Sequence, residues 1–256
     1  MSDAIVLGGF LAAATAVTVG WGRALWYVSE RSPVLRRWSF LALGRTHRTP
    51  GEVRALLLTA IYYSLGLLAA LLFTAAFQLP FLAIARFGAD DVTWVILGAI
   101  GEISLSSLLV ELGVRATGNR APERFAEIQE IPWMKGLRQL PPAMVPVVAA
   151  LAGAVEETFY RGVLLGILTM RFSVPPIAAV AISGTLFCVE QLLQVRTAFQ
   201  AMIIASGCVA ISMVGGLLVV ARGSFVPAAL CHASFVLFFM NQGSQRRRAG
   251  TRAVTT

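Results

Sequence analysis

The sequence predicts an all-α fold, a polytopic membrane bundle of about seven or eight transmembrane helices. Of its residues, 57% are hydrophobic and 13% are charged, whereas an ordinary soluble domain carries about 25% charged residues. The mean hydropathy is +0.75, and apolar runs recur at lengths near the roughly 20 residues that cross a bilayer. Because a segment in lipid has to satisfy its own backbone hydrogen bonds, these runs are predicted to be helices.

The amino-terminal part, residues 1–142, is predicted to combine transmembrane helices with basic cytoplasmic loops. Its three spans are expected at 4–21, 55–77 and 92–114. No basic segment precedes the first span, so we expect a transmembrane helix there and not a cleaved signal peptide. The arginine-rich segments 22–54 and 115–142 are placed on the cytoplasmic side by the positive-inside rule. Segment 115–142 is either an amphipathic stretch along the interface or an irregular polar loop, since Pro132 would interrupt a helix.

Residues 143–241 are predicted to form a helical core that carries the chemistry, followed by a basic cytoplasmic tail at 242–256. Four further spans are expected, at 143–170, 176–193, 198–220 and 225–240. Gly215 and Gly216 in the third of these would permit close helix contact. The alternation of basic segments places the amino terminus outside and the carboxyl terminus in the cytoplasm, and we expect the plasma (inner) membrane of a bacterium.

Two adjacent glutamates, Glu156 and Glu157, lie within a predicted span. Charge at membrane depth costs roughly 2.5–3.5 kcal/mol per residue, so such groups usually face a bundle interior and serve a function. Arg161 follows Glu157 by four residues and can pair with it on one helix face. Glu156 points about 100° away and has no obvious local partner. This asymmetry predicts one structural carboxylate and one working carboxylate.

Three late segments resemble the motifs of the CPBP family of intramembrane proteases, which includes type II CAAX-processing endopeptidases and bacteriocin-processing or self-immunity proteins. They read EETFYR at 156–161, FCVEQ at 187–191 and HASFV at 232–236, against family patterns EExxxR, FxxxH and HxxxN or HxxxD. The resemblance implies that Glu156 is a general base that activates water inside the membrane. It also implies that histidine and asparagine side chains stabilise the oxyanion, and that Glu157 and Arg161 form a structural pair.

The sequence departs from the family pattern at two positions. Phe187 and His232 match, but Gln191 stands where the second motif has histidine and Val236 where the third has asparagine or aspartate. Gln191 keeps an amide that could hold a water or an oxyanion, although it does not titrate near neutral pH. Val236 offers no polar group. These changes leave open whether the site, lined by Phe187 and Val236, still catalyses.

Other buried polar residues have simpler interpretations. Glu190 could be a partner for Gln191, but we favour a place near the cytoplasmic end of its helix. Glu102 and Glu111 are expected to pair with arginines or to line water near the interface. Phe159 and Tyr160 are expected to pack in the core and not to grip a substrate.

No metal and no cofactor are expected. A catalytic zinc site takes three protein ligands, whereas the chain has two histidines, His47 in the amino-terminal basic loop and His232. Cys231 and His232 are neighbours that diverge by about 100° on a helix, so they do not easily share one ion. The net charge of +8 comes from arginines between apolar runs and therefore does not indicate nucleic-acid binding.

Three functions remain open. The first is an intramembrane endopeptidase that matures a membrane-anchored protein or a hydrophobic peptide, with Glu156, His232 and Gln191 in the site. The second is a pseudoprotease that binds such a segment as an adaptor, chaperone or immunity protein, as the changes at Gln191 and Val236 suggest. The third is a proton-coupled carrier, suggested by the intramembrane carboxylates.

Overall fold

The protein is an all-helical bundle, as the sequence predicts. The computed structural model describes residues 3–43, 48–118 and 121–239, and it contains no strand within these ranges. Five helical segments in them are long and apolar enough to cross a membrane: α1 (Asp3–Arg31), α3 (Pro50–Phe77), α5 (Asp91–Thr117), the rod Pro142–Arg171 and α10 (Ala198–Arg222). Two predicted spans form shorter apolar helices, α9 (Pro176–Leu192) and a last described helix, Val226–Phe239, here called the carboxyl-terminal helix.

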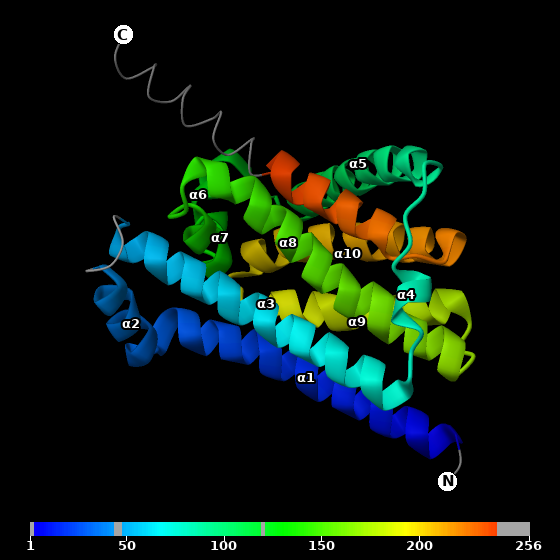
Figure 1. Ribbon diagram of the computed structural model, residues 1–256. Helices are drawn as coiled ribbons and strands as arrows, with labels where there is room; N and C mark the ends of the chain where they lie inside the picture. Colours follow the sequence, from blue (N-terminus) through cyan, green and yellow to red (C-terminus); the bar gives the residue numbers. More distant parts are fainter. Residues whose placement is uncertain (1–2, 44–47, 119–120, 240–256) are drawn as a thin grey trace.

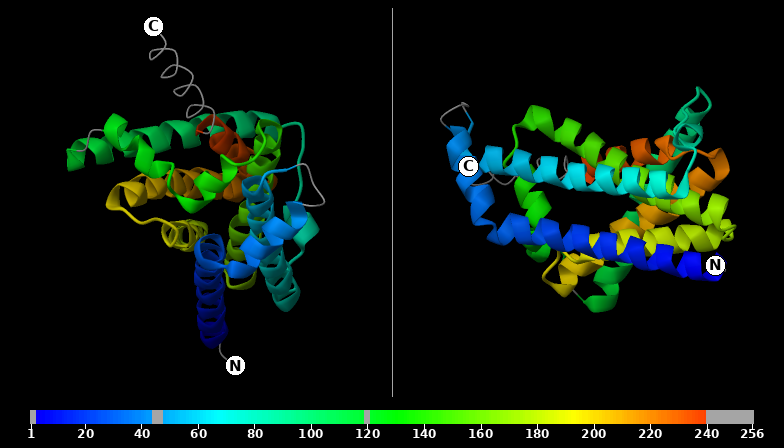
Figure 2. Two further views of the ribbon diagram at one scale, coloured as in Figure 1. Left: turned by 90° about the vertical axis from the view of Figure 1, so that its left-hand side faces the viewer. Right: turned by 60° about the horizontal axis from the view of Figure 1, so that its bottom comes forward.

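The long helices run roughly along one direction, and the short helices gather at the ends of the bundle (Figure 1). Helices α2 (Pro33–Leu43), α6 (Ala121–Ile128) and α7 (Pro132–Leu137) lie at one end, here called the basic end, and α4 (Phe81–Ile84) lies near the other. Helix α1 lies at one margin of the bundle and α5 at the opposite margin (Figure 2). The rod and α9 lie between these margins, and they contribute the buried residues Glu156, Glu157, Arg161, Glu190 and Gln191.

Local sequence signals explain where two of the long helices begin. Thr49 caps α3 and Thr197 caps α10, and each forms a reciprocal capping box with the residue three positions later, Glu52 and Gln200 respectively. Such caps contribute about 1 kcal/mol each. Helix α10 ends at Gly223, whose φ of 64° is a left-handed conformation that glycine adopts without strain.

The rod changes its winding at the predicted site. It starts with a short turn, Pro142–Met144, and continues as α8 (Val145–Glu157). Two π-helical stretches follow, Thr158–Leu164 and Ile167–Arg171. Wide π turns are rare and occur frequently at functional sites. The sequence did not indicate this change, because apolar spacing alone does not separate π from α winding.

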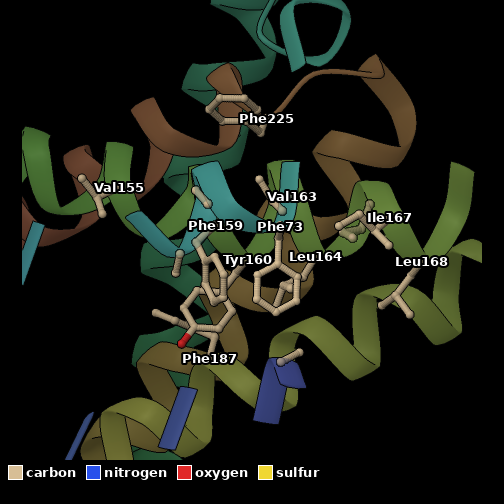
Figure 3. Close-up of a cluster of buried hydrophobic side chains, with 14 of the residues drawn as sticks. Phe73, Val155, Phe159, Tyr160, Val163, Leu164, Ile167, Leu168, Phe187 and Phe225 are labelled. Carbon is tan, nitrogen blue, oxygen red and sulfur yellow. The ribbon is translucent and has the colours of Figure 1, made fainter. Parts of the chain in front are cut away.

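An aromatic cluster anchors the π-helical stretch in the middle of the bundle (Figure 3). Phe159 and Tyr160 are completely buried. The Phe159 ring meets Phe73 of α3 edge-to-face, with ring centroids 5.9 Å apart. The Tyr160 ring meets Phe187 of α9 in the same way at 5.3 Å. Edge-to-face pairs add about 0.5–1.5 kcal/mol each beyond their buried area. Both residues therefore pack in the core, and they fix the stretch that follows the two glutamates.

The carboxyl-terminal helix crosses α8 at very short range. A Cβ atom placed on Gly153 would lie 3.0 Å from the carbonyl oxygen of Ala229 and 3.0 Å from the backbone nitrogen of Ala233. These are backbone atoms, which cannot rotate away as a side chain can. Glycine at this position therefore lets His232, between those two residues, come close to the end of α8.

The described part of the segment between α5 and the rod is helical and not an irregular loop, and its place along the membrane interface stays a prediction. It folds into α6 and α7, with Pro132 at the first position of α7, where a proline needs no hydrogen-bond partner. Ile128 and Ile131 are buried and pack with Phe199 of α10. The expectation that Pro132 interrupts a helix was wrong, because the proline begins one.

Polar contacts hold α6 on the start of α10. The Arg124 guanidinium donates to Glu127 at 2.6 Å, the Thr197 hydroxyl donates to the same carboxylate at 2.9 Å, and the Gln200 amide donates to the Glu127 carbonyl at 2.6 Å. The Arg124 hydrogen bond, helped by Thr197, lowers the pKa of Glu127. The four residues are called the α6 latch below.

Candidate active site

A cavity of about 700 Å³ extends from the middle of the bundle toward the basic end. Most of the side chains that line it are apolar, and they come from α1, α3, α5, α7, α8, α9, α10 and the carboxyl-terminal helix. Glu156, Gln191 and His232 are in its wall, together with Phe187 and Val236. The structure thus brings residues from all three predicted motifs to one cavity.

Glu156 receives polar groups from three other helices. The Tyr62 hydroxyl of α3 donates to its Oε1, and the Gln191 amide of α9 donates to the same oxygen at 3.3 Å. The His232 Nε2 of the carboxyl-terminal helix lies 3.6 Å from Oε2. The side chain of Glu156 is 7% exposed. Its Oε1 is held by two donors, whereas Oε2 faces His232 at the longer distance of 3.6 Å.

Glu157 and Arg161 form the predicted ion pair. Arg161 Nη1 lies 3.1 Å from Glu157 Oε1, and the two side chains are 1% and 0% exposed. Arg161 also donates to the Ser212 hydroxyl of α10 at 3.1 Å, and its guanidinium lies 4.6 Å from the centre of the Phe187 ring. The pair therefore ties the π-helical stretch to both α9 and α10.

His232 lies between the two glutamates. Its Nδ1 is 3.1 Å from Glu157 Oε1, and its Nε2 faces Glu156 Oε2. A carboxylate at one ring nitrogen fixes the orientation of an imidazole and decides which nitrogen carries a proton. Here Glu157 Oε1 faces Nδ1 and favours a proton on that nitrogen, and Nε2 is directed at Glu156 Oε2. A protonated His232 donates at both nitrogens.

Gln191 is engaged by two carboxylates. Its Nε2 donates to Glu190 Oε2 at 2.8 Å as well as to Glu156. Gln194 donates to the other Glu190 oxygen at 3.1 Å. Glu190 is completely buried in the last turn of α9, so it lies near the end of its helix as we favoured, and it is also the partner of Gln191 that we had considered as the alternative. A carboxylate at this depth is retained because two amides supply its hydrogen bonds.

Phe187 and Val236 complete the wall next to His232. The Phe187 ring meets the His232 ring edge-to-face at 5.8 Å. Val236 follows His232 by one helical turn and lines the same cavity. It lies where the family motif has asparagine or aspartate and provides no hydrogen-bond donor.

Sequence reasoning missed Tyr62 and misjudged Glu102. Tyr62 is 94 residues from Glu156 in the chain, and its only signal was a hydroxyl in the middle of an apolar span. Glu102 is completely buried, and neither carboxylate oxygen has a hydrogen-bond partner among the described residues. The expected pairing with an arginine or with interfacial water was therefore wrong for Glu102. It was confirmed for Glu111, which pairs with Arg115 at 2.7 Å on the surface.

No group of three His, Cys, Asp or Glu side chains in the described part of the chain is arranged to hold a metal ion. His47 lies outside the described residues. The expectation of a site without metal stays a prediction. Cys231 donates to the Val95 carbonyl at 3.2 Å, so it contacts α5 and is directed away from the ring of His232.

One of three comparisons with known proteins finds a match. Residues 138–238 match the family described as type II CAAX prenyl endopeptidase Rce1-like. The match confirms the predicted resemblance to CPBP intramembrane proteases, and it contains every site residue described above except Tyr62. No curated protein and no solved structure matches the chain.

Proposed function

We propose that the protein is an intramembrane endopeptidase that uses Glu156 to activate water and matures a membrane-anchored protein or a hydrophobic peptide. One observation carries the proposal: Glu156 lies in the wall of a largely apolar cavity, with Tyr62, Gln191 and His232 converging on its carboxylate. A site of this kind holds a carboxylate in fixed geometry away from bulk water, as a general base requires.

The reaction follows from these positions. Glu156 Oε2 takes a proton from a water molecule while the water oxygen bonds to the substrate carbonyl carbon. The carbonyl oxygen becomes an oxyanion, and His232, protonated at both ring nitrogens in this step, donates to it from Nε2. The intermediate then collapses, the C–N bond breaks, and the proton held by Glu156 passes to the leaving amine. Glu157 keeps His232 in position through Nδ1.

The cavity supports the proposed substrate class. A volume of about 700 Å³ lined mainly by apolar side chains is within the range of ligand-binding cavities and would bury an apolar segment. The polar groups are concentrated at Glu156, Gln191 and His232, so a bound chain would meet them at one point. Removing one oxyanion donor typically costs about 10²–10³ in rate. Val236 therefore makes us expect slow turnover.

We further propose the organisation that the sequence suggests. The core at 143–241 carries the site, residues 1–142 supply Tyr62 and the basic end, and the tail at 242–256 lies in the cytoplasm. The match at 138–238 supports this core. The arginines of the basic end, including Arg36, Arg37 and Arg54, support a cytoplasmic orientation of that end in a bacterial inner membrane.

The test is a census of protein termini in membranes from four strains: wild type, gene deletion, Glu156→Gln and Glu111→Gln, with matched expression of the variants. Glu111 is a surface glutamate on α5 and is the matched control. We expect a new terminus in the wild type and in Glu111→Gln that is missing from the other two strains. A terminus that persists in Glu156→Gln would show that Glu156 is not the base.

The second candidate is a pseudoprotease that binds a hydrophobic segment without cleaving it. Two observations favour it: both amide hydrogens of Gln191 are directed at carboxylates, and Val236 supplies no donor. In that case deletion would remove a partner or a mature product, whereas Glu156→Gln would retain it. The same census therefore separates the two candidates.

A further inference from the structure

Glu190 lies directly behind the site and takes no part in the proposed reaction. It is completely buried and is not in the cavity wall, in contrast to its neighbours Gln191 and Gln194. Its two carboxylate oxygens accept from different amides, at 2.8 Å from Gln191 and at 3.1 Å from Gln194. Glu190 therefore contacts the cavity wall through these two glutamines and through the Tyr62 hydroxyl, and Gln191 makes the shorter of the two amide hydrogen bonds.

The two carboxylates around Gln191 decide which way its amide points. Nε2 lies 2.8 Å from Glu190 Oε2 and 3.3 Å from Glu156 Oε1. A rotation of the amide by 180° would place its carbonyl oxygen against two carboxylate oxygens, which are acceptors, and would leave two N–H groups without these partners. The two flanking carboxylates thus keep the NH₂ group of Gln191 directed at themselves.

The consequence is that Oε1 is the atom of the Gln191 side chain that can still form a hydrogen bond. Both hydrogens of the amide are used, and Oε1 has no hydrogen-bond partner among the residues that the structure describes. Gln191 lines the cavity beside Glu156. A water molecule there can donate one hydrogen to Glu156 and the other to Gln191 Oε1. The water then has its lone pairs free for attack.

We propose that Glu190 is a positioning residue that orients the Gln191 amide, so that Gln191 holds the attacking water as an acceptor. The assignment rests on the proposed endopeptidase function. In this assignment Gln191 is a hydrogen-bond acceptor for the attacking water. It is then not a hydrogen-bond donor to the oxyanion. Without the Glu190 carboxylate, the amide keeps only its longer hydrogen bond to Glu156 at 3.3 Å, so it is held less firmly and the water loses a fixed second contact.

The first test is a double-mutant cycle on the rate at which the Glu156-dependent terminus appears after substrate synthesis. Glu190→Gln is expected to lower this rate by roughly 10²-fold, the usual effect of misplaced reacting groups. In a Gln191→Ala background the same substitution is expected to have almost no further effect, because the residue through which Glu190 acts is gone. Equal losses in both backgrounds would show that Glu190 acts through stability or through its contact with Tyr62, and would overturn the proposed action on Gln191.

The second test does not depend on cleavage. Protein labelled with ¹⁵N-glutamine in lipid nanodiscs gives side-chain amide signals, and Gln191 is identified by the signal that disappears in Gln191→Ala. We expect this amide to exchange its hydrogens slowly in the wild type and in Glu111→Gln. In Glu190→Gln we expect it to shift and to exchange faster, with the other glutamine signals outside the 190–194 turn unchanged.

The two tests distinguish a failure of the endopeptidase function from a failure of the positioning role of Glu190. If no terminus depends on Glu156, the endopeptidase function is overturned. If the Gln191 signal is the same with and without Glu190→Gln, the positioning role is overturned, whatever the cleavage assay shows. A shifted signal together with a rate loss that disappears in Gln191→Ala supports both.

Discussion

Replacing Arg161 by methionine is expected to destabilise the bundle strongly. Methionine keeps much of the side-chain length and packs against the same apolar neighbours, but it removes the only positive partner that contacts Glu157 besides the histidine, within the described residues. Glu157 is completely buried and cannot reach water. The substitution therefore leaves a carboxylate whose desolvation is no longer compensated.

The magnitude follows from the contacts that are lost. The hydrogen bond to Ser212 is worth about 0.6 kcal/mol, since side-chain hydrogen bonds between membrane helices average that value. The cation–π contact with Phe187 adds about 2 kcal/mol when it is desolvated. Stranding one partner of a buried ion pair costs roughly 3–5 kcal/mol. The stranded charge on Glu157 is therefore the dominant effect, and we expect a total of about 3–5 kcal/mol or more.

The assay is the fraction of folded, monodisperse protein that remains in detergent after heating. For a chain of this size, 1 kcal/mol shifts the midpoint by about 2–4 °C, so Arg161→Met should unfold roughly 6–20 °C below the wild type. The control is Arg115→Met, which breaks the exposed pair with Glu111 and should cost about 0.3–0.5 kcal/mol.

A double variant identifies the source of the cost. Glu157→Gln combined with Arg161→Met removes the stranded charge, so it should recover part of the lost stability relative to Arg161→Met alone. If Arg161→Met melts together with the wild type, the pair is not structural. If the double variant shows the sum of the two single losses, an uncompensated charge is not the reason for the loss.

Two further substitutions test how the site is positioned. Gly153→Ala should push the carboxyl-terminal helix away from α8, because its Cβ meets backbone atoms at 3.0 Å. We expect this variant to be about 1–3 kcal/mol less stable than Gly20→Ala, the control, because Gly20 has open space around it. Equal melting temperatures of the two variants would show that the contact at Gly153 is not tight. For the α6 latch, the pKa of Glu127 is lowered by Arg124, so its contribution to stability is complete above the pKa of the unfolded chain and is lost as pH falls through the folded pKa. Hydrogen exchange in α6, corrected for intrinsic rates, should therefore rise at acidic pH in the wild type but not in Glu127→Gln.

The parts of the molecule that the sequence predicted depend on composition and short spacings. Apolar runs determine helices because lipid leaves the backbone no other partner, and all the predicted spans are helical. The pairing of Glu157 with Arg161 was predictable because four residues bring them to one face. It survives the π-helical winding that begins at Thr158.

The parts that the sequence did not predict depend on distant segments meeting. Tyr62 reaches Glu156 only because α3 packs against α8, and nothing in the local pattern of α3 indicates that register. Glu190 was expected near the end of its helix, which it is, but the sequence did not predict that it would be completely buried there. Its actual environment is set by how α9 faces α8. Contacts of this kind need the packing of whole helices, which a pattern of residue types does not contain.

The division into one structural and one working carboxylate is less sharp than the sequence suggests. Glu157 Oε1 lies 3.1 Å from Arg161 Nη1 in the ion pair, but the same oxygen also lies 3.1 Å from His232 Nδ1. If Arg161 is removed, His232 is the one remaining contact of this Glu157 oxygen among the described residues, so the position of the ring depends on an oxygen that has lost its other partner. Loss of Arg161 should then disturb the group that faces Glu156 Oε2 before the bundle unfolds. The ion pair and the catalytic groups are thus coupled through one histidine, so stability and activity at this site are not expected to change independently.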